Sequence, residues 1–167
     1  MSPMALASLA FSALVLAGAP ARSDTLLAAI DGAWKGSGWV KRSAASPREA
    51  VRCRIATEYA EIGQRLTVSG KCVTPGKKVD LDGMIASADG RSRYVGRWSN
   101  PFGIGSAAVH GTRQGQSINL RFTAKDPETN ESVDQAMTWR ITEREFTMSS
   151  HANAAKDQVL SSIVFRR

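Results

Sequence analysis

The stretch VRCRIATEYAEIGQRLTVSGKCVT, Val51–Thr74, decides the fold of this chain. Alternating apolar and polar residues run on both sides of Ile62-Gly63, a pattern typical of two strands joined by a tight turn. A reversal at this dipeptide places Cys53, on one strand, directly opposite Cys72 on the other. The same register predicts three further pairs on that side: Ile55 with Gly70, Thr57 with Val68, and Tyr59 with Leu66.

The opposed cysteines predict a disulfide if the chain is exported, because thiols oxidise in extracytoplasmic compartments. Closing a loop of about 20 residues stabilises a fold by roughly 3 kcal/mol in the chain-entropy model. The alternative is that Cys53 and Cys72 are two buried free thiols.

The N-terminus indicates export. Met4–Gly18 is an apolar run of signal-peptide length, and Ala19-Pro20-Ala21 supplies small residues for cleavage, although the usual basic residues before the run are missing. The alternative is a buried N-terminal helix. We expect a signal peptide at residues 1–21 and a single domain at 22–167, periplasmic or secreted. No other apolar run is long enough to cross a membrane as a helix, so the mature chain should carry no transmembrane segment.

Three more hairpins follow from turn dipeptides at Asp89-Gly90, Gln114-Gly115 and Glu143-Arg144. The first predicts the pairs Leu81 with Trp98, Gly83 with Gly96, Ile85 with Tyr94 and, on the other face, Asp82 with Arg97. The second predicts the pairs Ala107 with Phe122, Val109 with Leu120 and Gly111 with Ile118. The third, which has the weakest turn chemistry, predicts the pairs Ile141 with Phe146 and Trp139 with Met148.

A first strand at Asp31–Arg42 and a last strand near Gln158–Arg166 bring the total to about ten. A short helix precedes them, capped by Ser23 or Asp24 and ended by Gly32, and its apolar side suits a plug at one barrel end. We therefore predict an all-β protein, an antiparallel up-and-down β-barrel of about 8–10 strands with a short N-terminal helix. A two-sheet β-sandwich is the alternative.

Glycines fall on the inward face of these registers, and they leave two interpretations of the interior open. Bulky neighbours fill the space in the first, and a small cavity remains in the second; we favour the filled core because protein interiors pack densely. The glycines are Gly36, Gly38, Gly70, Gly83, Gly96 and Gly111, and the bulky residues are Trp34, Trp98 and Trp139.

Gly32-Ala33-Trp34 resembles the G-x-W signature of calycins, the superfamily of lipocalins, fatty-acid-binding proteins, avidins and a bacterial metalloprotease inhibitor. In that superfamily the Trp packs across one barrel end against a basic residue of the last strand, and the resemblance implies Arg166 for that role. The inhibitor family also carries a disulfide between early strands, to which Cys53–Cys72 is similar. The resemblance implies a barrel that binds rather than catalyses.

Residues for catalysis or metal binding form no recognisable pattern. His110 is expected on the wet face of a strand and His151 in a loop, and the sequence places no carboxylate to orient either one. Metal-binding spacings such as C-x-x-C and H-E-x-x-H are missing, and Asp80 and Asp82 suit a solvated face. We expect no enzyme activity, no catalytic residue, no cofactor and no metal.

The charge is more informative, because the chain carries a net charge of +7 and 15 of its 22 basic residues are arginine. The registers place a group of basic side chains on the outside of neighbouring strands: Arg52, Arg54, Lys71, Arg93 and Arg97. Guanidinium groups suit carboxylate and phosphate, while the alternative is an ordinary charged exterior. Trp39 lies between Lys35 and Lys41 on the outer face, either exposed or covered by the N-terminal helix.

These observations favour a non-enzymatic periplasmic barrel that binds an anionic or amphipathic envelope ligand, such as a lipid or an acidic glycan. The five basic residues would supply charge outside, with Trp34 and Trp98 inside. The alternative is a protein–protein module, an inhibitor or accessory factor of an envelope enzyme, in which the N-terminal segment or Asn100–Gly105 inserts into a partner. We expect no nucleic-acid partner, and the sequence leaves the oligomeric state open.

Overall fold

The computed structural model describes residues 24–99, 105–125, 130–152 and 158–167. Residues 1–21, where we expect a signal peptide, lie outside the described residues, as does the 100–105 loop except for Gly105. No helix in the described ranges is long and apolar enough to span a bilayer.

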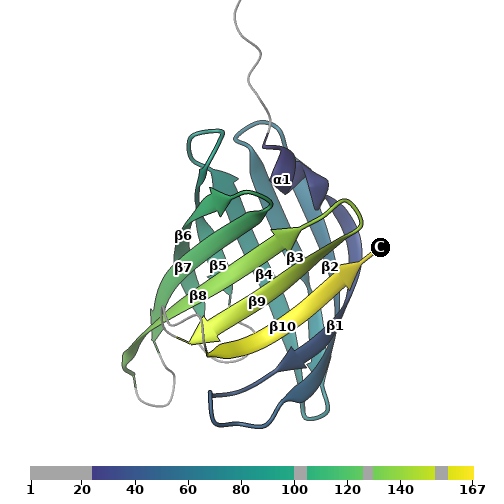
Figure 1. Ribbon diagram of the computed structural model, residues 1–167, viewed down its shortest axis with the longest axis vertical. Coiled ribbons are helices and arrows are strands. Elements are labelled where there is room, and N and C mark those ends of the chain that lie inside the picture. The colour runs from purple at the N-terminus through teal and green to yellow at the C-terminus, as the bar shows by residue number, and fades with distance from the viewer. Residues whose placement is uncertain (1–23, 100–104, 126–129, 153–157) are drawn as a thin grey trace, which may run out of the picture.

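The described chain forms a closed antiparallel barrel of ten strands, which confirms the predicted fold and rejects the sandwich (Figure 1). Each strand pairs with its neighbours in sequence, and β1 closes the barrel by pairing with β10. Closure pairs every strand with a neighbour on both sides, so the described sheet has no edge strand open to aggregation. The strands are β1 (Gly32–Val40), β2 (Glu49–Ala60), β3 (Arg65–Thr74), β4 (Lys77–Ser87), β5 (Arg93–Ser99), β6 (Ser106–Gln114), β7 (Ser117–Lys125), β8 (Ser132–Ile141), β9 (Glu145–Ala152) and β10 (Val159–Arg166).

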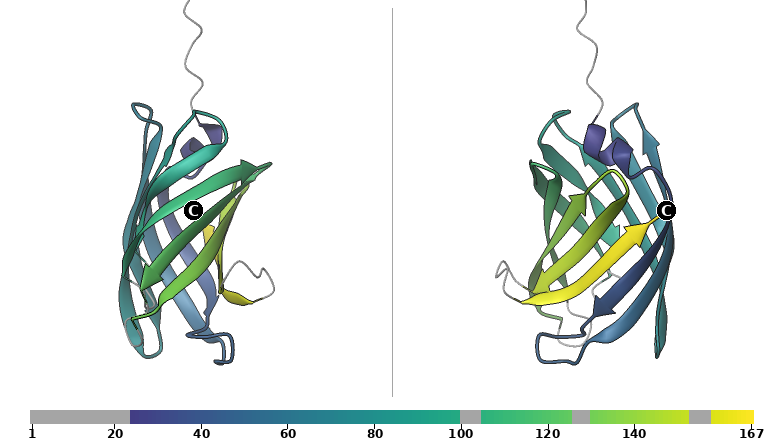
Figure 2. Two further views of the ribbon diagram at one scale, coloured as in Figure 1. Left: turned by 90° about the vertical axis from the view of Figure 1, so that its left-hand side faces the viewer. Right: turned by 45° about the vertical axis from the view of Figure 1, so that its right-hand side comes forward.

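The expected N-terminal helix is present as α1 (Thr25–Ala29), and it covers one end of the barrel (Figure 2). Asp24 is its N-cap, because the carboxylate accepts hydrogen bonds from the backbone N–H groups of Leu26 and Leu27. Leu26, Leu27 and Ile30 are buried in the core. The helix therefore closes the barrel with its apolar side, as expected.

The hairpin between β2 and β3 has the predicted register, with Cys53 opposite Cys72 and a disulfide between them. Its loop is longer than the predicted dipeptide, because β2 ends at Ala60 and β3 begins at Arg65. The centre of the reversal stays at Ile62-Gly63, so every pair is kept. The β8–β9 register is also as predicted, with Trp139 opposite Met148 and Ile141 opposite Phe146.

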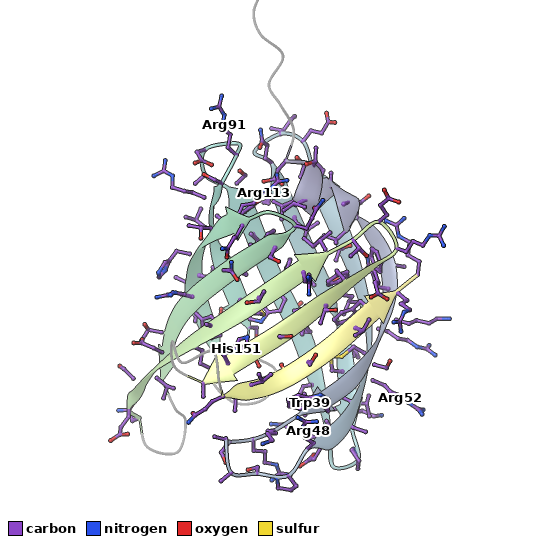
Figure 3. All side chains as sticks on the ribbon, in the orientation of Figure 1. Trp39, Arg48, Arg52, Arg91, Arg113 and His151 are labelled. Atoms are coloured by element: carbon purple, nitrogen blue, oxygen red, sulfur yellow. A yellow bond between two sulfur atoms is a disulfide. The ribbon has the colours of Figure 1, made fainter. Side chains whose placement is uncertain are left out.

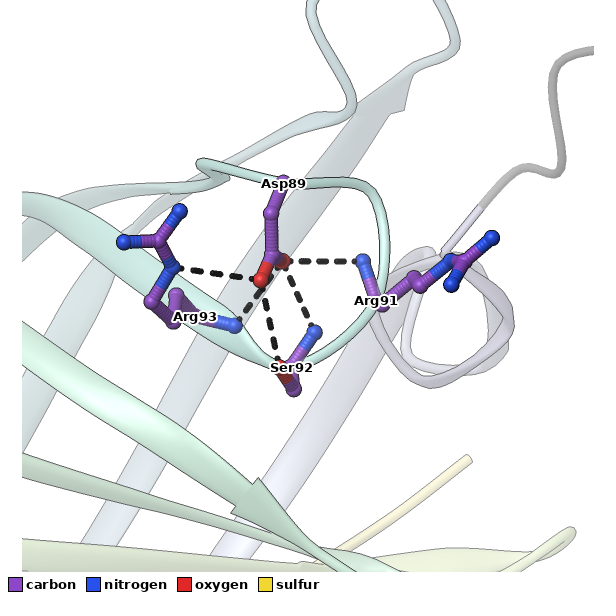
Figure 4. Close-up of polar contacts among 4 residues, drawn as sticks. All are labelled: Asp89, Arg91, Ser92 and Arg93. Carbon is purple, nitrogen blue, oxygen red and sulfur yellow. Dashed lines mark hydrogen bonds and ion pairs between the residues drawn. The ribbon is translucent and has the colours of Figure 1, made fainter.

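The β4–β5 register differs from the prediction, since Gly83 faces Trp98, Ile85 faces Gly96, and Ser87 faces Tyr94. Asp89 is the cause, because its carboxylate accepts hydrogen bonds from backbone N–H groups at 3.0, 2.8 and 3.0 Å, which organises a longer loop than a two-residue turn (Figure 4). These hydrogen bonds, donated by the backbone N–H groups of Arg93, Ser92 and Arg91, hold the pKa of Asp89 well below its ordinary value.

The β6–β7 register also differs from the prediction, and Gly111 faces Leu120 rather than Ile118. Gly115 has φ +59° and occupies the first position of the Gly115-Gln116 turn, where a type II′ turn requires positive φ. Both corrected registers move by two residues, which keeps each side chain on its predicted face. The inside and outside assignments therefore survive the corrections.

Aromatic rings fill much of the interior. Trp34 packs edge-on against Phe146 with ring centroids 5.0 Å apart, and Phe146 stacks on Phe165 at 4.7 Å. Trp98 packs edge-on against Trp139 at 5.4 Å. Glycines make this possible, since a Cβ added at Gly83 would lie 2.1 Å from the Trp98 ring. These contacts favour the filled interpretation around the aromatic residues.

Candidate functional site

Four cationic side chains lie side by side on the outer surface, one on each of four adjacent strands. Lys71 on β3 is opposite Arg54 on β2, Arg54 is opposite Lys35 on β1, and Lys35 is opposite Arg166 on β10. All four residues are exposed. With strands about 4.8 Å apart, this line spans about 15 Å, and we call Lys71, Arg54, Lys35 and Arg166 the basic row.

Carboxylates neutralise the two ends of the basic row and leave its centre charged. Lys71 Nζ lies 2.9 Å from Asp80 Oδ1, and this hydrogen bond raises the pKa of Lys71. At the other end, Arg166 Nη2 lies 2.8 Å from Glu145 Oε2. Lys35 and Arg54 have no carboxylate within ion-pair distance in the described part of the chain. An anion approaching the centre therefore meets two uncompensated cations.

A second line of residues, one outward position further along the strands, adds charge and an apolar group. Arg52 on β2 lies opposite Val73 on β3, and Val73 lies opposite Lys78 on β4. Arg52 and Lys78 are exposed, and Val73 keeps 42% of its surface exposed. We define the basic face as the basic row together with Arg52 and Lys78.

The basic face is electrostatically unfavourable without a partner. Like charges directly opposite each other on neighbouring strands destabilise a sheet, and the basic row contains three such contacts in succession. Two of the side chains are guanidinium groups, whose planar donors match carboxylate and phosphate oxygens. A bound anion would relieve the repulsion, and this makes the basic face the leading candidate for a binding site.

The structure brings together three of the five predicted outer cations, Arg52, Arg54 and Lys71, and it leaves Arg93 and Arg97 apart. Arg93, at the start of β5, pairs instead with Asp89 in the preceding loop, where Arg93 Nε lies 3.2 Å from Asp89 Oδ2.

Arg97 on β5 lies between Met84 and Ala108 rather than opposite Asp82, so the predicted Asp82–Arg97 pair is wrong. The two-residue shift of the β4–β5 register is the reason.

Sequence reasoning missed the contribution of Lys35 and Arg166 to this surface. Lys35 was assigned only a place beside Trp39, and Arg166 a place against Trp34. The β1–β10 pairing at barrel closure sets both next to Arg54. The alternating pattern of the first and last strands contains the signal, but using it requires knowing that those two strands pair.

Trp34 and Trp98, the predicted interior ligand residues, are 2% and 3% exposed and are committed to packing. Trp34 Nε1 donates a hydrogen bond of 2.9 Å to the Ile30 carbonyl. The basic side chain over the Trp34 ring is that of Arg167, whose guanidinium carbon is 4.7 Å from the ring centroid, and not that of Arg166 as the resemblance implied. Arg166 is on the outward face of β10 and pairs with Glu145 instead.

Arg167 and the residues around Asp24 seal the barrel end under α1. The Arg167 guanidinium donates to the Ala29 and Asp31 carbonyls at 3.3 and 2.9 Å, and the Asp24 N–H donates to the Tyr59 hydroxyl at 3.2 Å. Nearby, burial and then the Asp24 carboxylate raise the pKa of Tyr94. These polar groups fasten the helix to the strands, which gives this end a structural role.

Trp39 lies on the outer face of β1, half-buried, at the part of the barrel away from α1 (Figure 3). Its strand neighbours are the small residues Ala50 and Ser162. The ring is covered by the guanidinium of Arg48, 4.1 Å from its centroid, and not by the N-terminal helix. Trp39 is therefore an outward aromatic group with a cationic cover.

The two histidines lie apart on the outside of the barrel. His110 is exposed on β6, between Val95 and Arg121, so no carboxylate is paired with it across either strand. His151 belongs to strand β9 rather than to the loop expected there, because β9 continues to Ala152. In the described ranges, His, Cys, Asp and Glu side chains form no group of three or more that could hold a metal ion.

The outer surface thus offers a basic row whose two central cations, Lys35 and Arg54, are uncompensated, with an aromatic group further along β1, and the interior offers packed rings. Comparisons add no family or relative to this geometry: no protein-family model and no curated protein matches the sequence.

Proposed function

We propose that this protein is a non-enzymatic binding protein of the cell envelope, which holds an anionic or amphipathic ligand on its basic face. The observation that carries the proposal is the basic row, in which Lys35 and Arg54 stand adjacent with no neutralising carboxylate in the described structure. Lipid head groups and acidic glycans both present the phosphate or carboxylate oxygens that such cations bind.

The packing of the interior supports an outer site over an inner one. Trp34 and Trp98, which sequence reasoning placed in an inner ligand site, are each in ring contact with another core aromatic residue. Their engagement leaves the exposed cations as the groups with unused binding capacity. In this proposal the calycin resemblance describes the barrel, while the ligand lies outside it.

The disulfide supports the location. A bond between Cys53 and Cys72 is stable in an oxidising compartment and is rare in the reducing cytosol. We propose that residues 1–21 act as a signal peptide and that residues 22–167 function in the periplasm or outside the cell. Anionic lipids and acidic glycans are abundant on envelope surfaces, in keeping with a chain of net charge +7.

The test is retention of the Arg52→Glu/Arg54→Glu variant on heparin beads and on vesicles containing phosphatidylglycerol. The matched control is Arg121→Glu/Arg140→Glu, which changes the net charge equally on β7 and β8. A basic residue contributes about 1 kcal/mol at an anionic surface, so losing two should weaken binding about 30-fold. Salt of about 0.1 M gives a Debye length of about 10 Å, short enough to suppress attraction by net charge alone.

The control variant should bind within about threefold of the wild type, because the loss of attraction depends on distance from the ligand. Equal losses in the two variants would show that net charge, and not the basic face, causes retention. Unchanged retention of Arg52→Glu/Arg54→Glu would reject the proposal outright.

A further inference from the structure

We infer that the ligand of the basic face is the surface of an anionic phospholipid bilayer, and that Trp39 is the interfacial anchor that accompanies the cations. This inference rests on the proposed function and narrows it to one source of anions. Its starting point is the outward side of β1, where Lys35, Ser37 and Trp39 follow one another. Lys35 and Trp39 are therefore about 13 Å apart along one strand of the same surface.

The residues around Trp39 match the chemistry of a membrane interface. Arg52 lies opposite Ser37, one outward position from Trp39 along β1, and Val73 lies on the far side of Arg52. The surface thus alternates guanidinium groups with an indole ring and an exposed aliphatic side chain. Tryptophan is enriched at the level of lipid head groups, and clustered Lys and Arg residues bind anionic lipids.

The Arg48 cover explains how Trp39 remains compatible with water in the unbound protein. The guanidinium lies 4.1 Å from the ring centroid, and both side chains are on the outside of the barrel. A cation–π contact at an exposed site is weak, so a lipid phosphate can draw Arg48 away. The small neighbours Ala50 and Ser162 leave the freed indole face open to the interface.

Trp39 also distinguishes a bilayer from a soluble glycan. The basic row alone is sufficient to bind a linear polyanion, which would leave the outward Trp39 and Val73 without a role. A bilayer offers phosphates to the cations and a less polar layer just beneath them to the two apolar side chains. The bilayer therefore accounts for both the cations and the outward apolar side chains of this surface.

The distribution of tryptophan makes the inference directly measurable. The chain contains four tryptophans, and Trp34, Trp98 and Trp139 are exposed by only 2%, 3% and 1%. The neutral quencher acrylamide should therefore report mainly on Trp39. The full protein, as its expression host processes it, would be mixed with vesicles of phosphatidylcholine alone or of phosphatidylcholine with phosphatidylglycerol.

We expect the mixed vesicles, and not the neutral ones, to lower acrylamide quenching at least about threefold, because the interface shields the ring. Lipids brominated on the acyl chain should quench the tryptophan fluorescence of the bound protein. Trp39→Phe should abolish that quenching, and it should weaken vesicle binding, measured by sedimentation, about three- to tenfold. Arg54→Glu should weaken vesicle binding about fivefold, and so reduce both the acrylamide protection and the bromolipid quenching at a fixed lipid concentration, whereas Arg140→Glu should leave both close to their wild-type values. All variants share one N-terminus, so any binding by residues 1–21 is constant.

The outcomes separate the inference from the proposed function. Binding to heparin without binding to mixed vesicles would overturn the bilayer and keep the basic face as a glycan site. Sedimentation with mixed vesicles, but with acrylamide and bromolipid quenching unchanged from the free protein, would overturn Trp39 as the anchor. Failure to bind either heparin or mixed vesicles would overturn the proposed function itself.

Discussion

Gly83 is the position where a single methyl group tests whether the barrel interior is filled. In the Gly83→Ala variant, the new Cβ would lie 2.1 Å from Cε3 and 2.3 Å from Cζ3 of Trp98. Trp98 is 3% exposed and packs edge-on against Trp139, with ring centroids 5.4 Å apart. Because the indole cannot swing into solvent, the strand and the ring must shift together.

The expected destabilisation follows from two opposing effects. Overpacking a filled core costs about 1–3 kcal/mol, and a rigid ring places this site near the upper limit. Replacing glycine also restricts the unfolded chain, which recovers about 0.4–1 kcal/mol. The net loss is about 2 kcal/mol in the free energy of unfolding, or a fall in Tm of about 4–8 °C for a domain of this size.

Urea denaturation followed by tryptophan fluorescence measures this loss, and Gly76→Ala is the matched control. A Cβ at Gly76 meets no atom within 4 Å, so that variant should be neutral or slightly stabilised. In a Trp98→Phe background, the smaller ring should make Gly83→Ala cost less, giving a coupling energy of about 1 kcal/mol. If Gly83→Ala proves as stable as Gly76→Ala, the interior has room beside Trp98, and a ligand site inside the barrel becomes a candidate again.

Three further predictions concern the closed end, the disulfide and acid stability. Arg167→Ala should lower the free energy of unfolding by about 1 kcal/mol in urea, while Arg166→Ala should change it by less than about 0.5 kcal/mol. Replacing both Cys53 and Cys72 by alanine should cost roughly 3 kcal/mol in the same assay. The pKa of Asp89 is lower in the folded protein than its value of about 3.9 in the unfolded chain, so the ionised carboxylate stabilises the fold above that pH. This stability should be lost as the pH falls below about 4 and Asp89 is protonated. Asp89→Asn should flatten that decline in urea titrations at low pH, and an unchanged slope would refute the assignment.

The hairpins show when a strand register can be predicted from the sequence pattern on either side of a turn. The β2–β3 register was predictable because the alternation on both sides and the cysteine pair agree on a single centre. The β4–β5 register was not, because the Asp89 carboxylate caps the loop between Ser87 and Arg93, and side-chain capping overrides the Asp-Gly turn preference. The error had to be an even number of residues to keep the apolar face inward, so the core prediction survived.

Only half of the basic row could be predicted from the sequence, because the other half depends on pairing between the first and last strands. Arg54 and Lys71 are hairpin partners, and their adjacency follows from the cysteine register alone. Lys35 and Arg166 join them only when β1 pairs with β10, a contact between the two ends of the chain that no local turn specifies. The same closure brings Arg167 over Trp34, one residue beyond the basic residue that the resemblance indicated.

The charge at the centre of the basic row is not the one that folding alone would favour. Strand neighbours of opposite charge are available to this sheet, as Lys71 with Asp80 and Arg166 with Glu145 show. A glutamate in place of Arg54 would give Lys35 and Lys71 an attractive neighbour on the strand between them, whereas arginine gives both a repulsive one. Folding therefore favours the opposite charge at the centre of the basic row. An arginine that opposes local stability at an exposed site, between two cations that share its charge, is the arrangement that the proposed anion site requires.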